Sequence, residues 1–476
     1  MVNIMEKEKK EKLTRKNYVS LDDVEVFEEE VEMLDEDNPL PKKKSPLKLA
    51  KHKKKKRKLK KWVYIIVLLS LILIGAFVYY YIHKENEEKA KLEISEKIKE
   101  IESHYNDIVI VNNKTNLYEK NNDNYEVIGS IYKDNVLELS SIKIDQNTKY
   151  FNIKDSDYYI EYESVSKTDK KEEYSNRYKK YLPFNKNVVT KDGFVLYDND
   201  KEIISFNKSM EFPIIINNYE NRYYVEYNNR LLSIKKDDVK EIIDKKNTDK
   251  KNISSVTTFA YHRVYSSEEK CTDPYVCIKK DSFDKEMKYL HDNNYLTFTM
   301  EEMYMYLKGN LQAERAVTIT LDDGYLYKSA EEVLKKYDLN ATMFVISNHF
   351  DNIEPFKKLT HIDIQSHTHH MHRNYVCSGG NQGGAILCAS KNEIISDLKT
   401  SVEKLGVEPF ALAFPFYDYN ENAINALKEV GFKMSFIGRG GVMGKSIPNK
   451  TNLYKIPRMT VWEESLMNFN TWKSYL

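Results

Sequence analysis

Two short segments combine carboxylates and imidazoles at a spacing that suits a metal site. The first is Thr-Leu-Asp-Asp-Gly at residues 320–324, and the second is Ser-His-Thr-His-His-Met-His at residues 366–372. The second segment places four of the chain's 11 histidines within six residues. Carboxylates and neutral imidazoles bind divalent metal ions, and a carboxylate left free beside them can act as a base. Together, the two segments predict a site that activates water.

Each segment follows a predicted β-strand. Residues 316–319 are a β-branched, apolar run that ends at the two aspartates, and residues 362–366 alternate like a second strand. Adjacent strand residues point to opposite faces, so two neighbouring aspartates can serve one centre only where the strand ends and the chain bends. Residues five apart point to different faces of both a helix and a strand, so neither element could present both His367 and His372 to one centre. If both are ligands, we expect His372 to lie one loop beyond the strand end.

Each segment alone has a simpler explanation. Asp and Gly are ordinary turn residues, so an Asp-Asp-Gly after a strand is more often a turn than an active site. Some histidine tracts bind metal ions adventitiously. The occurrence of both segments at strand ends in one α/β region favours an active site.

The two segments resemble motifs of the polysaccharide deacetylases of carbohydrate esterase family 4. Residues 320–324 are similar to that family's Thr-Phe-Asp-Asp-Gly, with Leu in place of Phe, and the second segment begins with its Ser-His-Thr. Most members place the second histidine four residues after the first, whereas His372 follows His367 by five. This variant looks like the branch that contains the biofilm poly-N-acetylglucosamine deacetylases. The resemblance covers about residues 255–476 and extends to residues 260–264, 413–416 and 456–458.

The resemblance implies a role for each residue of the site. Asp322 would be the general base. The ligands of a divalent metal ion, most simply zinc, would be Asp323, His367 and His372. The other two histidines of the segment remain alternatives to His372. The residues that the resemblance places at the substrate are Tyr325, Pro415, Phe416 and Arg458.

The chemistry that such a site supports is amide hydrolysis. A bound metal ion keeps a position open for water, lowers the pKa of that water toward about 7 and polarises the carbonyl. Attack gives a tetrahedral oxyanion, and an acid must protonate the leaving amine. The chain departs from the family at two positions: Ala413 stands where many members carry arginine, and the late Leu-x-His that supplies the acid is missing. His262, after a predicted strand, is the candidate acid, with a structural, hydrogen-bonded histidine as the alternative.

An apolar segment near the N-terminus predicts a membrane anchor. Residues 62–82 are 21 uncharged residues, long enough to cross about 30 Å of hydrocarbon. No cleavage pattern follows them, which argues against a signal peptide. The strongly basic residues 51–61 place the N-terminus in the cytoplasm and the rest of the chain outside the cell. This basic run could suggest a nucleic-acid partner, but the adjacent span already explains it, so we expect none.

Cysteine usage agrees with an extracellular location. All four cysteines follow the apolar segment, in a compartment that permits disulfides. Four cysteines allow three connectivities, and we favour local pairing because each pair would close a polar loop. The predicted pairs are Cys271 with Cys277 and Cys377 with Cys388. The second loop contains the Gly-rich residues 378–384, which we expect to form a flexible rim of the substrate groove.

Composition divides the chain, whose net charge is only +1 over 476 residues, into five parts. The β-rich part alternates tyrosine and β-branched residues with polar ones and shows a weak internal repeat. It predicts two small tandem barrels, similar to bacterial wall-targeting barrels, or else a plain β spacer. The five parts are a charged, disordered tail (1–61), a transmembrane helix (62–82), a helical stalk (83–105), a β-rich region (106–250) and a catalytic domain (255–476).

The catalytic domain alternates strands and helices, which predicts an α/β fold with a parallel sheet. The family resemblance sharpens this to a distorted, incomplete (β/α) barrel, with both motifs at the strand ends where barrel enzymes keep their sites. The predicted elements after the first motif are a helix at 328–337, a strand at 341–346, a helix at 391–405, a strand at 411–414 and a helix at 423–430.

We therefore expect a membrane-anchored, extracellular, metal-dependent deacetylase. Its substrate would be the N-acetylglucosamine-type residues of peptidoglycan. Two alternatives remain: secreted poly-N-acetylglucosamine as the substrate, and a wall-glycan-binding protein whose deacetylase-like domain has lost activity.

Overall fold

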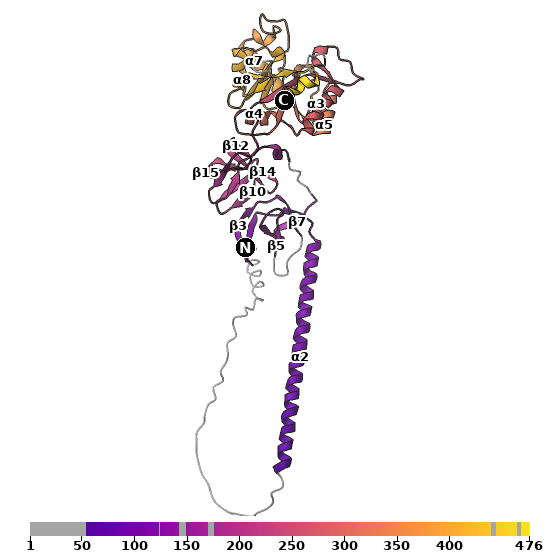
Figure 1. Cartoon of the computed structure of the whole chain (residues 1–476), viewed down its shortest axis with the longest axis vertical. Helices are drawn as coiled ribbons and strands as arrows, with labels where there is room; N and C mark the ends of the chain where they lie inside the picture. Colours follow the sequence, from indigo (N-terminus) through magenta and orange to yellow (C-terminus); the bar gives the residue numbers. More distant parts are fainter. Residues whose placement is uncertain (1–53, 123, 142–148, 170–175, 439–443, 464–467) are drawn as a thin grey trace, which may run out of the picture. The chain divides into compact units, whose positions relative to one another are not determined.

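Among the described residues of the computed structural model, the first element is one long helix, α2 (Lys54–Ser103) (Figure 1). It runs without a break through the apolar segment and the expected stalk. From Lys61 onward it is long and apolar enough to cross a membrane by length and composition, and none of its apolar window is buried. The structure describes residues 54–122, 124–141, 149–169, 176–438, 444–463 and 468–476, so most of the tail expected at residues 1–61 lies outside the described residues.

The β-rich region is a set of short antiparallel strands joined by tight turns. Asn and Asp occupy many of its left-handed turn positions, such as Asp134, Asn199 and Asn229, because their short polar side chains tolerate positive φ. The strands are β1 (Ile108–Val111), β2 (Thr115–Asn121), β3 (Asn124–Ile131), β4 (Val136–Glu138), β5 (Tyr150–Asn152), β6 (Tyr158–Glu161), β7 (Val165–Lys167), β8 (Lys186–Thr190), β9 (Phe194–Asp198), β10 (Lys201–Phe206), β11 (Glu211–Pro213), β12 (Ile216–Tyr219), β13 (Arg222–Tyr227), β14 (Arg230–Lys235) and β15 (Val239–Asp244).

The two sequence repeats share one sheet and one core. Strand β3 of the first repeat pairs with β10 of the second, through Ile131 opposite Ile204. This pairing joins both repeats into the nine-stranded order β12-β13-β14-β9-β10-β3-β2-β6-β5. A single buried apolar cluster contains side chains from both repeats, including Leu117 and Leu196. Each half also has a three-stranded sheet of its own, β4-β1-β7 in the first and β11-β8-β15 in the second, so the two halves lie side by side with a shared sheet and shared buried contacts.

The β-rich region makes direct contacts with residues 255–476, the predicted catalytic domain, which we call the catalytic part. Arg177 donates to the carboxylate of Glu302, whose own side chain also caps the N-terminus of helix α4 (Met300–Leu307). Tyr219 donates to Glu301 at 2.8 Å, and its ring belongs to an apolar cluster shared with Phe344. A spacer that only separates two domains would not need such a shared core.

The catalytic part is built around a parallel, barrel-shaped sheet, as the sequence predicted. Strands β20, β21 and β22 are buried along nearly their whole length because helices cover them. The strands in order of pairing are β16 (Val256–Tyr261), β20 (Ala316–Asp323), β21 (Ala341–Val345), β22 (Ile362–Ser366), β23 (Ala411–Ala413), β24 (Met434–Ile437) and β26 (Ile456–Pro457).

One short segment brings the two edges of this sheet together. Strand β26 pairs with β24, and β27 (Met459–Thr460) pairs in parallel with β16 at the other edge. Arg458 is the single residue between them. The short strands β19 (Leu296–Thr297) and β25 (Lys445–Ser446) extend the sheet, while β17 (Arg263–Tyr265) pairs with β18 (Cys277–Lys279) outside it.

The helices follow the predicted positions closely. Helix α5 (Lys328–Tyr337) and helix α7 (Lys391–Leu405) have the predicted bounds, and α8 (Glu421–Val430) begins two residues earlier because Asn420 caps it. The other helices of this part are α3 (Lys280–Asp292), α6 (Glu354–Lys357) and α9 (Phe469–Lys473).

A buried polar chain ties α3 and α9 to the barrel. Tyr261, at the end of β16, donates to Glu286 of α3 at 2.7 Å, and it accepts from the indole of Trp472 in α9 at 3.0 Å. Burial, together with the nearby charge of Glu463, raises the pKa of Glu286 from 4.5 to about 8, against the lowering effect of the Tyr261 hydrogen bond. The carboxyl group is therefore neutral at neutral pH.

This raised pKa makes the stability of the catalytic part depend on pH. The folded state holds the Glu286 proton more tightly than the unfolded state, so the free energy of unfolding falls as pH rises from 4.5 toward 8. We expect Glu286→Gln, which imitates the neutral acid, to match the wild type near pH 5 and to exceed it above about pH 8. Denaturant unfolding at both pH values measures these free energies.

The control is Glu332→Gln, at an exposed side chain of α5. Equal free energies of unfolding for the wild type and Glu286→Gln at both pH values would contradict the raised pKa of Glu286.

Candidate active site

The carboxylates of Asp322 and Asp323 converge at the C-terminal end of β20. Asp323 has a φ of 74°, in the left-handed region, so the strand ends with a bend at this residue. His367 Nε2 lies 4.0 Å from Asp322 Oδ2 and 3.8 Å from Asp323 Oδ1. Because of this bend, the side chains of Asp322 and Asp323 both face the ring of His367. The sequence analysis expected such a bend at the end of the strand.

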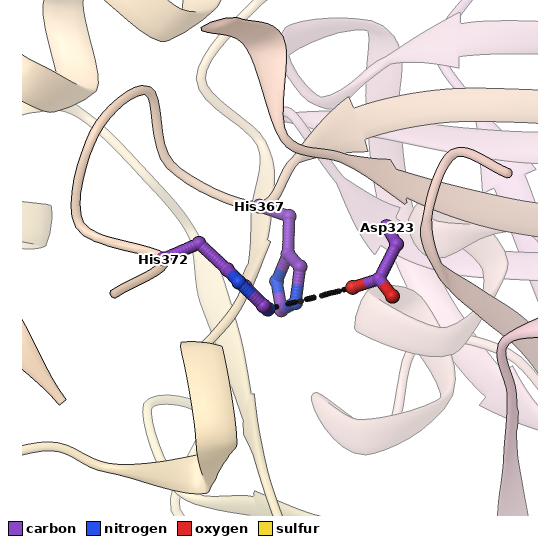
Figure 2. A group of neighbouring side chains, drawn as sticks. All are labelled: Asp323, His367 and His372. Atoms are coloured by element: carbon purple, nitrogen blue, oxygen red, sulfur yellow. Dashed lines mark ion pairs between the residues drawn. The ribbon is translucent and has the colours of Figure 1, made fainter. Parts of the chain in front are cut away.

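Three side chains form a compact group of possible metal ligands (Figure 2). Asp323 comes from the end of β20, His367 from the end of β22, and His372 from the loop that follows. His372 Nε2 lies 3.4 Å from Asp323 Oδ1, and one ligand atom from each residue lies within 4.8 Å of the others. Figure 2 shows both imidazole rings turned toward the carboxylate.

The orientation of His367 is fixed by the backbone of β23. Its Nδ1 lies 2.8 Å from the carbonyl oxygen of Ala413, which can only accept, so Nδ1 carries the hydrogen. Nε2 then presents its lone pair to the two aspartates. Burial lowers the pKa of His367, against the raising effect of the two aspartates, which favours the neutral ring that a metal ion needs.

The ring of His372 packs against two other aromatic rings. The ring of Phe416 lies 4.4 Å from it, centroid to centroid, and that of His367 lies 4.9 Å away. Burial, followed by the charge of His367, lowers the pKa of His372 to about 4. The ring is therefore neutral at any pH well above 4.

The other two histidines of the segment bind elsewhere. The Nδ1 atom of His369 lies 2.8 Å from Ser347 Oγ, and that of His370 lies 2.7 Å from the side-chain amide of Asn348. Their backbone N–H groups donate to the carboxylate of Asp397 at 2.8 and 2.5 Å. These two hydrogen bonds to Asp397 fix the loop in the conformation that places His372 beside Asp323 and His367. No signal in the sequence identified Asp397.

Asp322 is paired with a buried arginine. Arg458 donates from both terminal nitrogens to the two carboxylate oxygens, each at 2.7 Å, and both side chains are almost fully buried. Burial alone would raise the pKa of Asp322, but Arg458, His367 and His262 together hold it well below its usual range. The carboxylate is therefore ionised at physiological pH.

Two residues that the sequence placed at the substrate are buried. Arg458 is fully buried, and its guanidinium pairs with the carboxylate of Asp322. Pro415 is also buried, whereas Phe416 lies at the site with its ring against His372. Ala413 is buried in β23, and its contact with the site is the hydrogen bond that its carbonyl oxygen accepts from His367.

His262 lies at the end of β16, next to the aspartates. Its Nε2 is 4.0 Å from Asp322 Oδ2, and 14% of its side chain is exposed. Among the described residues, its buried Nδ1 has no hydrogen-bond partner. The ring is thus close to the carboxylate pair without the hydrogen bonds that a purely structural histidine would make.

A cavity of about 460 Å³ opens over the ligand group. Tyr325, predicted from the resemblance, donates or accepts a 3.0 Å hydrogen bond with His349 Nδ1, and the guanidinium of Arg263 lies 5.2 Å from its ring. Arg263 Nη2 is also 3.7 Å from Asp323 Oδ2. Arg263 and His349 were not singled out from the sequence, although each follows the end of a barrel strand. The lining residues are Arg263, Lys270, Asp323, Tyr325, Leu326, Ile346, His349 and His372.

The donor set fits a divalent metal ion. One carboxylate and two imidazoles are ligands that zinc and related ions accept, and burial lowers the pKa of both rings, which favours their neutral form. The hydrogen bond from His367 to Ala413 and the packing of Phe416 on His372 fix the two rings in ligand-competent positions. The open cavity leaves room for water and substrate.

Comparison with known proteins gives one family. Residues 309–435 match the family model described as "Polysaccharide deacetylase". The Bacillus subtilis (strain 168) protein YxkH, named as a polysaccharide deacetylase, is 29% identical over 195 residues, which are 39% of this chain and 65% of that protein. A Staphylococcus aureus (strain MRSA252) poly-beta-1,6-N-acetyl-D-glucosamine N-deacetylase is 27% identical over 208 residues, covering 40% of this chain and 69% of that protein.

Solved structures also match. The Streptococcus pyogenes deacetylase PplD, in complex with acetate, is 21% identical, with a TM-score of 0.40 over 47% of this chain and 99% of that one. The chain thus spans just under two thirds of YxkH and nearly all of the PplD chain.

The Asp322–Arg458 pair should contribute strongly to stability. Removing one partner leaves a buried charge without compensation, which typically costs about 3–5 kcal/mol. We expect Arg458→Met to lose an amount of this order in denaturant unfolding, and Arg458→Met combined with Asp322→Asn to lose less. Arg315→Met, at an exposed arginine, is the control. A loss in Arg458→Met no larger than in this control would show that the pair is not buried as described.

Proposed function

We propose that the protein is a metal-dependent N-deacetylase of N-acetylglucosamine polymers, on the premise that residues 309–435 match the polysaccharide deacetylase family model. The observation that carries the proposal is the site itself. Asp323, His367 and His372 form a metal-ligand group, and the separate carboxylate of Asp322 lies beside them under an open cavity. Zinc is the expected ion.

The ion, when bound, supplies a water of lowered pKa and a polarised acetamide carbonyl. Asp322 takes the proton of the attacking water. Its pairing with Arg458 makes it a weak base, which suits a water that is already acidic, and fixes its two oxygens in place. Asp322 cannot rotate away, because Arg458 holds both oxygens at once.

His262 completes the proton transfers. Attack forms a bond from the water oxygen to the acetyl carbon, and collapse of the tetrahedral oxyanion breaks the bond from that carbon to nitrogen. His262 donates a proton to the leaving amine, and its Nε2, 4.0 Å from Asp322 Oδ2, lies close to the reacting groups. The proton that Asp322 takes up is released to solvent. The products are acetate and a glucosamine residue with a free amine.

The substrate that we propose is poly-β-1,6-N-acetylglucosamine. The S. aureus relative is named for that polymer, and the five-residue spacing from His367 to His372 is similar to that branch of the family. Peptidoglycan, the substrate favoured by the sequence, is the second candidate. The apolar part of α2 supports it, because a tether would hold the enzyme near the wall.

We further propose that α2 anchors the protein in the cell membrane with the catalytic part outside. The apolar window of α2, the basic residues before it and the two disulfides after it support this topology. Both disulfides join the cysteines predicted from the sequence, Cys271 with Cys277 and Cys377 with Cys388.

The base is tested with Asp322→Asn in the full chain. Asparagine keeps the shape of the side chain and does not remove a metal ligand. The variant loses the stability of the buried ion pair, so it is assayed at a temperature at which circular dichroism shows it folded, and there we expect wild-type metal content by elemental analysis. Acetate release should fall by roughly 10²- to 10⁴-fold, the usual contribution of a general base. Asp363→Asn on β22, outside the site, is the matched control. Retained acetate release in Asp322→Asn would refute this base, and a wild type without metal would favour the binding-protein alternative.

The substrate is tested by acetate release from poly-β-1,6-N-acetylglucosamine and from purified peptidoglycan at equal N-acetyl concentration. We expect kcat/KM to be at least about tenfold higher on the soluble polymer, a difference of about 1.4 kcal/mol in transition-state binding. Asp322→Asn measured on both substrates controls for contaminating activity. Equal or faster release from peptidoglycan would assign the enzyme to the wall instead.

A further inference from the structure

The turn that follows β23 holds two consecutive residues in an unfavourable backbone conformation. Phe416 and Tyr417 have φ values of 56° and 61°, in the left-handed region that residues other than glycine rarely adopt. Such a conformation persists only where the surrounding structure holds it, and it is often found at functional sites. The ring of Phe416 lies 4.4 Å from that of His372, centroid to centroid. The strained turn therefore places Phe416 against a residue of the metal-ligand group.

The barrel holds one side of this turn. The hydroxyl of Tyr417 lies 2.8 Å from Thr460 Oγ1 on β27, and its ring lies 5.3 Å from the guanidinium of Arg458. A Cβ on Gly438, the residue after β24, would lie 2.8 Å from Tyr417 Cγ, so the ring and this backbone are in close contact. These contacts fix Tyr417 from the side of the barrel.

A loop closed by a disulfide holds the other side of the turn. This loop is residues 377–388, which we call the brace loop. The carboxylate of Asp418, whose side chain is buried, accepts hydrogen bonds from three backbone N–H groups of the brace loop. The side-chain amide of Asn381 donates to the carbonyl of Phe416 at 3.1 Å. The expected flexible rim is therefore bound to the turn. The three N–H groups belong to Asn381, Gln382 and Gly384, the last two at 3.1 and 2.8 Å.

The brace loop also fits closely around Asp418 and Phe416. Gly380 has a φ of 70°, and a Cβ there would lie 2.3 Å from Asp418 Oδ1. A Cβ on Gly384 would lie 3.3 Å from Phe416 Cδ2. Glycines permit this close approach, but they lose more conformational freedom than other residues when they are ordered. Because residues 378–384 include four glycines, the loop needs fixed ends to keep this form.

The disulfide fixes the two ends of the brace loop beside the histidine segment. It joins Cys377 to Cys388. Within the loop, the backbone N–H of Ala385 donates to the carbonyl of Arg373, the residue after His372, at 2.9 Å. A disulfide reduces the number of open conformations available to the chain that it closes. The bond therefore favours the form in which the brace loop reaches Asp418.

We propose that the brace loop is a positioning element of the metal site, which binds its ion tightly only while the Cys377–Cys388 disulfide is formed. This inference rests on the proposed function. Without the disulfide, the glycines regain their freedom, and the buried carboxylate of Asp418 loses its donors. The turn then relaxes, and Phe416 no longer holds His372 in its ligand position. The loss of contacts behind a metal ligand typically lowers metal affinity by about 10- to 100-fold.

The disulfide opens by thiol–disulfide exchange with a dithiol reductant. One thiolate of the reductant attacks a sulfur of the Cys377–Cys388 bond, and the second closes the reductant into its own disulfide. Two electrons and two protons pass from the reductant to the protein, so the S–S bond breaks and both cysteines become thiols. We therefore expect metal affinity to be low where thiols stay reduced and high where disulfides persist.

The test titrates the metal-free full chain with Zn²⁺ in competition with a chelating dye. The double variant Cys377→Ser with Cys388→Ser, which leaves no thiol to bind zinc, should raise the Kd for Zn²⁺ by about 10- to 100-fold. Asp418→Asn, which keeps the disulfide, should raise the Kd by a similar factor. Combining all three substitutions should add little, because both changes act through the same contacts.

The matched control removes the other disulfide, through Cys271→Ser with Cys277→Ser, and should leave the Kd unchanged. Circular dichroism first establishes that each variant is folded. The visible absorption of bound Co²⁺, which depends on the number and geometry of its ligands, should change in both brace variants and not in the control.

The outcomes separate this inference from the proposed function. A wild type that neither binds Zn²⁺ nor releases acetate refutes the proposed function. A wild type that binds Zn²⁺, with an unchanged Kd in the folded brace variants, overturns the brace while the function stands. An equal rise of the Kd in the control also overturns it, because the disulfides would then act on the catalytic part as a whole. If the cysteine variant fails to fold, Asp418→Asn decides alone.

Discussion

The ion pair between Asp322 and Arg458 connects the barrel to its chemistry. Arg458 is the one residue between β26 and β27, the segment through which β24 and β16 are brought into the same barrel. The desolvation of two buried charges is offset only when their geometry is good, and here both carboxylate oxygens are engaged at 2.7 Å. The segment that completes the sheet therefore also fixes the charge and orientation of the proposed base.

The rest of the site is positioned from several strand ends. The carbonyl of Ala413 on β23 orients His367, and the carboxylate of Asp397 on α7 folds the histidine loop. Phe416, in the turn after β23, supports His372. Each support comes from a different part of the chain, so small shifts between strands would displace the ligand group. The close packing of the barrel core opposes such shifts.

The β-rich region is connected to the catalytic part by more than a covalent link. Arg177 and Tyr181 both contact the buried carboxylate of Glu302, which also caps α4. Because that carboxylate is nearly fully buried, losing its partners would leave an uncompensated charge at the base of the barrel. Several tyrosines of this region pack against one another, as the stacked rings of Tyr125 and Tyr150 show.

The sequence by itself determined the local features: the strand ends that carry Asp322 and His367, the bounds of helices such as α7, and the two short disulfide loops. These depend on periodicity, caps and turns, which act over a few residues. Only the tertiary structure decided that Arg458 pairs with Asp322, 136 residues away, and that His372 rather than His369 completes the ligand group. It also decided that β3 of the first repeat pairs with β10 of the second. Such contacts follow from how distant strands pair and close, which no local pattern encodes.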